Sequence, residues 1–250
     1  MSEKALEFEN VSFSYGNKEI LKGVDLSIKK GEFVSLIGAS GSGKSTIFRL
    51  ITGLEKVDSG VIQLNGEMRE NRHGKVGYMP QRDLLMPWRT VYENVRLPLE
   101  LNRTEIHSDE ITEMLDAFGL DGYAKKYPGE LSGGMRQRVS FLRATLAGSE
   151  LLLLDEPFSA LDALTKLFMQ EWLLERWERD KKTVLFITHD ISEAVFLSDR
   201  ILVLEETPAK MLTEIEVPLD RPRRRKDEDL PAVLHLKESL IERFRKQALK

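Results

Sequence analysis

The residues from Gly38 to Thr46 have the types and the spacing that a bound phosphate group requires. They match the P-loop pattern, in which a glycine and four variable residues precede Gly-Lys-Ser. The glycines permit backbone turns that a Cβ would block, so several N–H groups can converge on one anion. Lys44 adds a cation near the outer phosphates, and the Ser45 hydroxyl can bind Mg²⁺. The alternative, a Gly/Ser-rich linker, is disfavoured because an apolar strand (33–37) precedes the loop and a helical pattern (47–51) follows it.

Two adjacent carboxylates follow the most apolar strand of the chain. Leu151 to Leu154 are four leucines in a row, which suits a central parallel strand covered on both faces. Asp155 and Glu156 come directly after them, at the strand end where α/β proteins bind ligands. Asp155 could therefore reach a metal near the P-loop, and Glu156 could act on water. Acids at a strand end are often only solvated, but the presence of a P-loop favours the functional interpretation.

Three further residues are candidates for which an ordinary alternative remains open. Gln81 ends a short strand (75–81), where its amide could ligate a metal or orient water, or it is a surface glutamine. His189 ends the apolar strand that begins at Thr183, at a position typical of ligand-binding residues, although by itself it would be an ordinary loop residue. Tyr15 could stack on a purine base, or it is an aromatic residue at a strand end.

The segment Leu131-Ser132-Gly133-Gly134 is a second candidate anion site. Ser132 has the type and position of a helix N-cap, and the two glycines leave the backbone bare at the positive end of that helix. An ordinary glycine-rich helix start explains the same residues equally well.

The spacing of apolar residues predicts which elements position these side chains. Residues 6–13 and 20–28 alternate between apolar and polar, as half-buried strands do, and they predict an antiparallel β layer. The later strands are expected at residues 33–37, 61–64, 75–81, 151–156, 183–189 and 200–204. Helical patterns at 90–101, 108–118 and 133–147 predict a subdomain inserted in the α/β core, and Thr90 with Glu93 forms a capping-box pattern at its start.

Two later segments also have helical spacing. Between residues 164 and 174 the bulky side chains predict one side that faces the core: Leu164, Leu167, Phe168, Trp172 and Leu174.

The basic run from Arg221 to Lys226 precedes three acids, which favours a solvated loop over a phosphate or lipid patch. A terminal helix is expected to dock on the core, with a partner interface as the alternative, through Val233, Leu236, Leu240, Ile241 and Phe244.

The composition excludes several classes of protein. The 250 residues are 31% charged and 41% hydrophobic, which suits one or two globular domains. The chain contains no cysteine, so disulfides and thiol chemistry are excluded. No apolar run is long enough to span a membrane and no signal sequence is visible, so a cytosolic location is expected. The net charge of -4 gives no general support for nucleic-acid binding.

Taken together, these motifs resemble an ATP-binding cassette (ABC) ATPase subunit over about residues 5 to 205. The resemblance is specific because six motifs occur in the family's order. They are Tyr15, the P-loop, Gln81, the signature at Leu131–Gly134, Asp155-Glu156 with Ser159–Asp162 after them, and His189. The resemblance implies an α/β fold: a P-loop NTPase (RecA-like) core with an N-terminal antiparallel β layer and an inserted helical subdomain.

The same resemblance implies an ATPase that uses ATP and Mg²⁺ in a head-to-tail pair of cassettes. The catalytic residues would be Glu156, His189, Lys44 and Gln81, and the residues that hold Mg²⁺ would be Ser45, Gln81 and Asp155. Ser132, Gly133 and Gly134 would bind the nucleotide of the other cassette. The remaining nucleotide-binding residues would be Tyr15, Gly38, Ala39, Ser40, Gly41, Ser42, Gly43, Lys44, Ser45, Thr46, Gln81, Asp155 and Asp162.

Within the family, residues 85–95 and 219–223 resemble the nitrate/sulfonate/taurine uptake group, to which thiamine-precursor importers belong. The resemblance therefore implies an importer subunit at the cytoplasmic face of the cell membrane. Its partners would be a second copy of itself or a homologous cassette, integral membrane permease subunits and, indirectly, a solute-binding protein, with no nucleic acid. Two alternatives remain, a soluble ABC ATPase that is not tied to transport and the ATPase subunit of an exporter.

The resemblance also implies a division of the chain. The ATP-binding core would cover residues 1–85 and 152–215, the helical signature subdomain 86–151, and the C-terminal tail and helix 216–250. The loop Leu84–Val91 is unusually apolar, and we expect it to form the rim of a groove for a short permease helix. The alternative is that its side chains simply pack into the helical subdomain.

Overall fold

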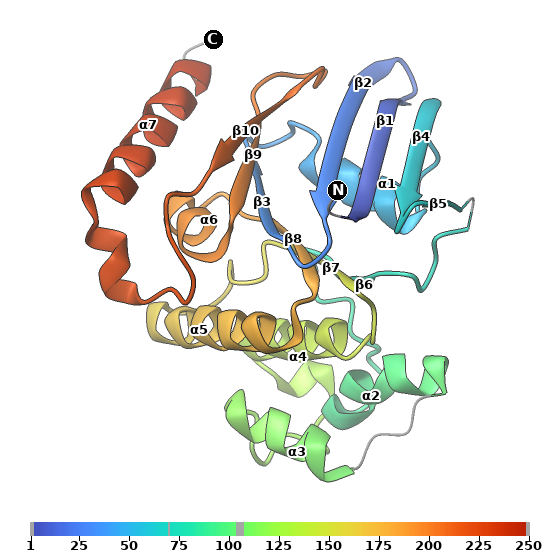
Figure 1. The fold of residues 1–250 in the computed structure, drawn as a ribbon. Helices are drawn as coiled ribbons and strands as arrows, with labels where there is room; N and C mark the ends of the chain where they lie inside the picture. The colour runs from blue at the N-terminus through green and yellow to red at the C-terminus, as the bar shows by residue number, and fades with distance from the viewer. Residues whose placement is uncertain (1–2, 70, 104–107, 249–250) are drawn as a thin grey trace. The chain divides into compact units, whose positions relative to one another are not determined.

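Two groups of residues pack as separate units in the computed structural model, which describes residues 3–69, 71–103 and 108–248. The first unit contains Met1–His73 and Arg176–Lys250, and the second contains Gly74–Glu175. Figure 1 labels their helices and strands. The second unit therefore contains the inserted helices together with two short strands, which begin at residues 77 and 151. The domain boundaries expected from the sequence stay a prediction.

The first unit begins with an antiparallel sheet in the order β2-β1-β4-β5. Its strands are β1 (Lys4–Tyr15), β2 (Lys18–Lys29), β4 (Ser59–Leu64) and β5 (Glu67–Met68). β1 pairs on both sides, so Phe8 lies opposite Leu26 in β2 and Ile62 in β4. These three side chains are buried together, because residues directly opposite each other on neighbouring strands point to the same face of the sheet. The antiparallel layer predicted from the alternating pattern is confirmed.

A second sheet in the same unit runs in the order β10-β9-β3-β8. β3 (Phe33–Gly38) lies between and parallel to β8 (Thr183–Ile187) and β9 (Arg200–Leu204), and β10 (Leu212–Glu216) pairs antiparallel to β9. All residues of β8 and nearly all of β3 are buried, as in strands covered on both faces. Because β3 and β8 are parallel, the segments that follow them leave the sheet at the same edge.

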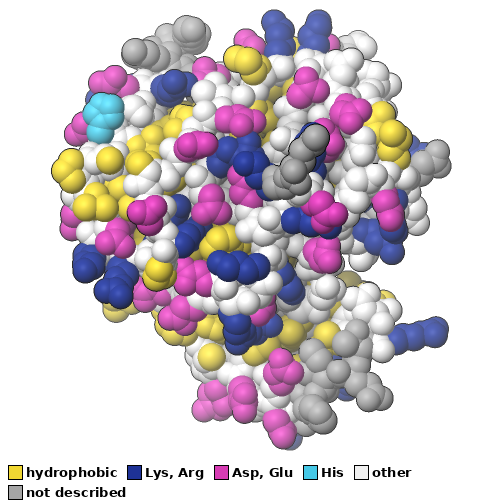
Figure 2. Space-filling view, viewed as in Figure 1, with side chains coloured by type: hydrophobic (Ala, Val, Ile, Leu, Met, Phe, Trp, Pro, Cys, Tyr) yellow, Lys and Arg dark blue, Asp and Glu magenta, His cyan; other side chains and the backbone are white. Residues whose placement is uncertain are grey.

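The helices of the first unit are α1 (Lys44–Thr52), α6 (Ile191–Leu197), α7 (Pro231–Ala248) and the 3₁₀ helix η2 (Arg225–Asp229). α7 packs through Val233, Leu236 and Leu240, which join one buried cluster with residues of β3, α6 and β9. Docking of the terminal helix on the core is therefore confirmed. Ile241 is an exception, since it is 42% exposed, and hydrophobic side chains remain visible over α7 in Figure 2.

The basic run from Arg221 to Lys226 contains two arginines that anchor the tail, so the expectation of a solvated loop was wrong for these two residues, while Arg224 and Lys226 are exposed. The Arg223 side chain is 1% exposed, and its guanidinium donates to two main-chain oxygens of α6. Two nitrogens of Arg221 donate to one oxygen of Asp199, and its guanidinium lies 4.3 Å from the ring centre of Trp177. Cations at a helix C-terminus satisfy carbonyls that have no partner within the helix. We call Arg221 and Arg223 the arginine anchor.

The second unit combines a short parallel strand pair with a group of helices. β6 (Gly77–Met79) pairs with β7 (Leu151–Asp155). The helices are α2 (Val91–Asn102), α3 (Ser108–Ala117), the 3₁₀ helix η1 (Pro128–Glu130), α4 (Gly133–Thr145) and most of α5 (Ala163–Asp180). The predicted capping box of Thr90 and Glu93 is present at the start of α2, and the three helical patterns are confirmed. In the described part of the chain, no helix has the length and apolarity needed to cross a bilayer.

Helix α5 buries a different side from the one that the sequence predicted. Met169 and Leu173 are buried, and of the predicted core residues only Leu174 is fully buried, while Trp172 packs edge-on against Phe118. Apolar residues occur on more than one side of this helix, so the spacing fits two rotational phases. The residues for which the prediction was wrong are exposed: Leu164, Leu167 and Phe168.

Candidate functional site

The P-loop leaves β3 and turns into α1 around the ammonium group of Lys44. Lys44 Nζ donates to the main-chain oxygens of Gly38 and Ala39, each at 2.8 Å. Gly43 has a φ of 103°, a conformation that costs glycine little and other residues much more. A Cβ at Gly38 would lie 2.8 Å from the main-chain oxygen of Leu204, so this position also requires glycine. The loop thus forms a backbone cradle for an anion at the N-terminus of α1.

Two hydroxyl groups of the loop fit a phosphate and its metal ion. Ser42 Oγ is buried and has no hydrogen-bond partner among the described residues. A buried polar atom without a partner destabilises a structure, and a phosphate oxygen would satisfy it. Ser45 lies in the first turn of α1 and is exposed, so its hydroxyl is open to an ion. A hydroxyl is an oxygen ligand of the kind that Mg²⁺ prefers. The residues present therefore fit a nucleotide phosphate with Mg²⁺.

His189 lies in a well-fixed turn between β8 and α6. The hydroxyl of Thr188, a buried residue, donates to Glu193 Oε2 and accepts the N–H of Asp190. Asp190 in turn caps α6 by accepting from the N–H groups of Ser192 and Glu193. His189 itself is exposed. Because β3 and β8 are parallel, the structure places His189 at the same sheet edge as the P-loop, as the sequence predicted.

Tyr15 ends β1, and neighbouring side chains hold its ring. The ring meets Phe13 edge-on, with 4.8 Å between the ring centres. Its hydroxyl lies 3.4 Å from Glu55 Oε1 and 3.4 Å from a guanidinium nitrogen of Arg49. Tyr15 is nevertheless 40% exposed, so part of it is open to a ligand. Its proposed stacking on adenine stays a prediction.

In the second unit, hydrogen bonds hold Glu156 at both its side chain and its main chain. Gln81 Nε2 donates to Glu156 Oε2 at 3.1 Å. The main-chain oxygen of Glu156 accepts from Gln137 Nε2 and from Ser159 Oγ, each at 3.0 Å. Glu156 has a φ of 50°, in the left-handed region, where a residue with a Cβ is destabilised by about 1–2 kcal/mol. The structure thus brings two predicted catalytic residues, Gln81 and Glu156, into direct contact, beside the buried Asp155.

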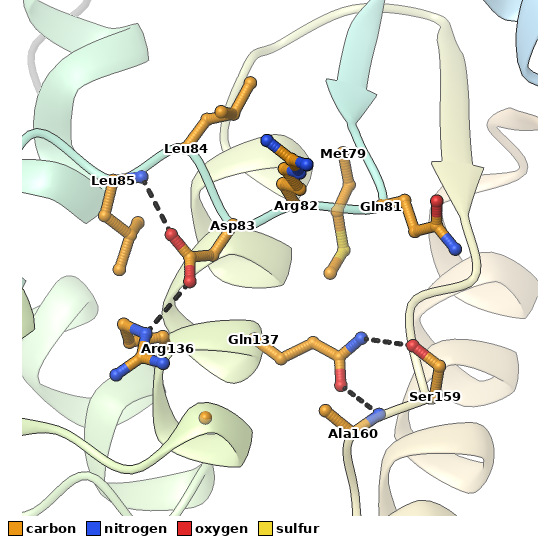
Figure 3. A pocket seen from close by; sticks show the side chains of 11 residues that line it. Met79, Gln81, Arg82, Asp83, Leu84, Leu85, Arg136, Gln137, Ser159 and Ala160 are labelled. Atoms are coloured by element: carbon orange, nitrogen blue, oxygen red, sulfur yellow. Dashed lines mark hydrogen bonds and ion pairs between the residues drawn. The ribbon is translucent and has the colours of Figure 1, made fainter.

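A pocket of about 520 Å³ opens in the second unit next to this contact (Figure 3). Its wall includes Asp83, which accepts from Arg136 Nε at 3.0 Å and from the N–H of Leu85. Gln137 extends across the pocket toward Ser159 and Ala160 (Figure 3). The lining residues are Met79, Gln81, Arg82, Asp83, Leu84, Leu85, Gly133, Arg136, Gln137, Ser159 and Ala160.

Sequence reasoning did not single out Gln137, although one signal could have found it. It stands three residues after Gly134, so both residues lie on the same side of α4. A polar side chain on the side of a helix that carries a close-packing glycine is a candidate for a buried contact. The sequence interpretation of this helix rests on Ser132 and the two glycines alone.

The start of α4 confirms Ser132 as its N-cap, because Ser132 Oγ accepts the N–H of Met135 at 3.3 Å. The two glycines that follow have different surroundings. A Cβ at Gly134 would lie 3.2 Å from the main-chain oxygen of Ala160, so packing requires a glycine there. Gly133 is exposed, and a Cβ on it would meet only the Arg136 side chain, at 3.9 Å. Ser132 and Gly133 are thus the part of the signature that is open to a ligand.

Asp162 precedes α5 and caps its first turn. Its carboxylate accepts from the N–H of Thr165 at 3.0 Å and from the Thr165 hydroxyl at 2.6 Å. The bond from the hydroxyl is the main cause that lowers the pKa of the Asp162 carboxyl below its ordinary value. Asp162 therefore has a local role at the helix start, and its role in nucleotide binding stays a prediction.

The predicted site residues fall into one set in each unit. The first unit contains Tyr15, the P-loop and His189, of which the P-loop and His189 share one sheet edge. The second contains Gln81, the signature, Asp155, Glu156 and Asp162, of which Gln81 and Glu156 are in contact.

Comparison with known proteins identifies the family. The ABC transporter family model matches residues 21–159, which is more than half of the chain. The chain is 47% identical over 227 residues to the formylaminopyrimidine import ATP-binding protein ThiZ of Halalkalibacterium halodurans, covering 90% of this chain and 89% of that protein. It is 42% identical over 218 residues to the aliphatic sulfonates import ATP-binding protein SsuB of Bacillus cereus, covering 87% and 86%.

Solved structures share the fold. A dimeric structure of a post-hydrolysis state of the ATP-binding cassette MJ0796, bound to ADP and Pi, matches with a TM-score of 0.76 and 32% identity. The match covers 86% of this chain and 100% of that one. The predicted fold class, a P-loop NTPase core with an N-terminal antiparallel layer and inserted helices, is confirmed. The chain therefore belongs to the ABC transporter family, and it is one of that family's ATP-binding, ATP-hydrolysing subunits.

Proposed function

We propose that this ATP-binding subunit of an ABC importer hydrolyses ATP in a head-to-tail pair of cassettes and thereby drives solute uptake. The observation that carries the proposal is the P-loop, with Lys44 inside its backbone cradle and the Ser42 hydroxyl without a partner among the described residues. Two relatives are import ATP-binding proteins, and a solved cassette of the same fold is a dimer with ADP and Pi. The other cassette of this pair, as we propose it, is a second copy of this chain or a homologous cassette.

The proposed catalytic residues are Glu156, Gln81, Lys44 and His189. Glu156 would accept a proton from the attacking water or polarise it, and its hydrogen bond with Gln81 supports a fixed orientation of the carboxylate. Lys44 would bind the outer phosphates, and His189 would steady the γ-phosphate and the water. Catalysis would come mainly from positioning and electrostatics, as phosphoryl transfer generally requires.

For Mg²⁺ we propose Ser45, Gln81 and Asp155 as ligands, directly or through water. A hydroxyl, an amide oxygen and a carboxylate are the oxygen donors that this ion prefers. When bound, the ion would neutralise negative charge on the phosphate oxygens. Ser132 and the following glycines would bind the γ-phosphate held by the other cassette, because bare N–H groups at a helix N-terminus attract anions.

Integral membrane permease subunits are the further partners that we propose, at the cytoplasmic face of the cell membrane, with a solute-binding protein acting indirectly. The proposed contact is the loop Leu84–Val91. Leu84 and Trp88 are 60% and 72% exposed, whereas Leu85 is buried, so the loop both packs into its unit and presents apolar surface. Exposed apolar side chains that gather on a loop are typical of an interaction site.

The solute that we propose first is formylaminopyrimidine, because the relative named for it is more similar than the relative named for aliphatic sulfonates. Sulfonates are the second candidate. Solute contacts in an importer lie on its other chains, so uptake by cells is the measurement that separates the two.

The test is uptake of labelled formylaminopyrimidine and of a labelled alkanesulfonate by cells that lack this gene. We expect the deletion to abolish uptake of one solute. The wild-type gene and Glu175→Gln, which changes an exposed carboxylate of α5, should restore it, and Glu156→Gln should not. Unchanged uptake of both solutes would refute both candidates, and an increased cellular content of a solute would indicate export.

A further inference from the structure

Gln137 connects the helix that begins at the signature to the backbone of Glu156. Its side chain, on α4, is almost fully buried. Its Nε2 donates to the main-chain oxygen of Glu156 at 3.0 Å and to Ser159 Oγ at 3.2 Å. Its Oε1 accepts the N–H of Ala160 at 2.9 Å. Both polar atoms of the amide are therefore used on one short segment, 156–160, as Figure 3 shows for Ser159 and Ala160.

The segment 156–160 needs such a support. Glu156 adopts a left-handed φ of 50°, which surrounding contacts have to maintain in a residue that is not glycine. Gly134 lets the two backbones approach closely, because a Cβ there would lie 3.2 Å from the main-chain oxygen of Ala160. α4 thus meets this segment through one close backbone approach and one buried amide.

The contacts of Gln137 and Gln81 are complementary. Gln81 holds the carboxylate of Glu156, and Gln137 holds its main-chain oxygen. Ser159 Oγ donates to the same main-chain oxygen at 3.0 Å, and Gln137 Nε2 in turn donates to that hydroxyl at 3.2 Å. Loss of Gln137 therefore removes one contact of the oxygen and leaves the other without its support, so the peptide unit can rotate and the carboxylate moves with it. A displacement of about 1 Å at a reacting group can lower a rate by about 10²-fold.

We propose that Gln137 is a positioning residue for Glu156, acting through the backbone of the segment 156–160. The inference rests on the proposed function, in which Glu156 acts on the attacking water. Gln137 acts within its own chain, although the signature at the start of the same helix would serve the nucleotide of the other cassette. This predicts a different phenotype for Gln137 than for the signature residues.

The first measurement compares Gln137→Met with Arg138→Met in the full chain. Methionine keeps the length and bulk of Gln137 but makes none of its three hydrogen bonds. Arg138 is the next residue of α4, and it donates to the main-chain oxygens of Phe118 and Gly119, away from segment 156–160. We expect Gln137→Met to lower kcat by between about ten- and a hundredfold, with KM for ATP and the melting temperature close to those of Arg138→Met. An equal kcat in the two variants would overturn the proposal.

The second measurement uses mixed dimers, purified through two different affinity tags, in which Glu156→Gln silences one site. In the first dimer, one chain carries Gln137→Met and the other carries Glu156→Gln. The active Glu156 is then in the chain that lacks Gln137. In the second dimer, one chain carries both substitutions and the other is wild type. The active Glu156 then has an intact Gln137, but it works with the signature of the altered chain.

The two dimers separate positioning of Glu156 from support of the signature. We expect low turnover in the first dimer and turnover near the Glu156→Gln/wild-type reference in the second. The reverse order would show that Gln137 supports the signature instead, and equal losses would show a general structural role. Either result overturns this inference while leaving the proposed function intact. Wild-type turnover by Glu156→Gln homodimers would refute the role of Glu156, and this inference with it.

Discussion

Glu156 occupies a backbone conformation that its side chain does not favour, and two glutamines and a serine hold it there. A left-handed residue directly after β7 directs its side chain differently from the strand residues before it. Strained conformations of this kind persist where the surrounding contacts determine them fully, and they cluster at functional sites. At the residue scale, this backbone conformation is an observation in favour of a functional Glu156, whose role as a catalytic residue stays a prediction.

Glu156→Gln is expected to bind ATP normally but to hydrolyse it at least about tenfold more slowly, because loss of a general base typically costs about 10²–10⁴-fold. The amide oxygen of the substituted residue can still accept from Gln81, so the geometry should persist. Phosphate release under saturating ATP, with Glu175→Gln as the control, measures the effect. Turnover near that of the wild type would refute the proposed role.

Tyr15→Ala is expected to weaken ATP binding by about 1–3 kcal/mol, the scale of one base–aromatic stack. GTP binding should weaken similarly, since an aromatic face does not distinguish base edges. Tyr15→Phe is the matched control, because it keeps the ring and removes only the hydroxyl contacts with Arg49 and Glu55. Calorimetry measures both variants, and an equal affinity of Tyr15→Ala and Tyr15→Phe would show that the ring does not stack.

Where a motif specifies several residue types in order, the position of single residues in the fold was predictable, while their chemical roles stay a prediction. The P-loop and the Asp155-Glu156 pair are of this kind. The sequence places Gln137 on the same side of its helix as Gly134, but it does not say which backbone that glycine allows to approach, so the hydrogen-bond partners of Gln137 could not be predicted. The left-handed φ of Glu156 was also beyond prediction, since glutamate has no preference for it.

Among the elements, helix α4 has two roles at its first turn. Ser132 caps the helix within its own chain, and Gly133 beside it is open. We expect the same turn to bind the nucleotide of the other cassette. Ser132→Arg should impair hydrolysis while leaving ATP binding to the isolated subunit nearly intact, because the proposed partner of Ser132 is the nucleotide of the other cassette. Equilibrium binding to the monomer and steady-state turnover test this in parallel.

A control for Ser132→Arg is Ser132→Ala, which removes the cap without adding bulk or charge and should cost about 0.5–2 kcal/mol of stability. If Ser132→Arg instead abolished ATP binding to the monomer while Ser132→Ala did not, the signature would belong to the nucleotide site of its own chain.

Elements were predictable in proportion to how simple their apolar pattern is. The alternating strands and the helix marked by Thr90 and Glu93 were predicted correctly, because one face of each is apolar or because a cap fixes the start. The orientation of α5 was not predicted correctly, because the leucines and aromatic residues of that helix lie on several of its sides. Periodicity cannot choose a face when several faces are apolar.

For the whole molecule, transport requires that work pass from the cassette to a membrane partner through a contact surface. Trp88→Glu should reduce solute uptake and transporter-coupled ATP hydrolysis far more than ATP binding, because a carboxylate would be placed on exposed apolar surface. Leu85→Glu, three residues earlier, would bury a charge and should instead destabilise the subunit. Uptake, binding and thermal unfolding measured on both variants separate the two roles.

The contrary outcome is that Trp88→Glu unfolds the isolated subunit as readily as Leu85→Glu. The loop would then be part of the core of its unit, and the permease contact would have to lie elsewhere. Equal uptake by the Trp88→Glu variant and the wild type would also contradict the proposed contact.

The arginine anchor changes how the basic run should behave toward proteases. Trypsin cleaves after lysine and arginine in extended, accessible chain, except before a proline, as at Arg221-Pro222. Arg223 has no such proline after it, yet it is buried beneath the end of α6. The exposed Arg224 and Lys226 adjoin the same anchored backbone. A stretch that looks like the most cleavable part of the chain is therefore protected while the tail is docked. Its rate of digestion reports how often the terminal helix and its anchor leave the core.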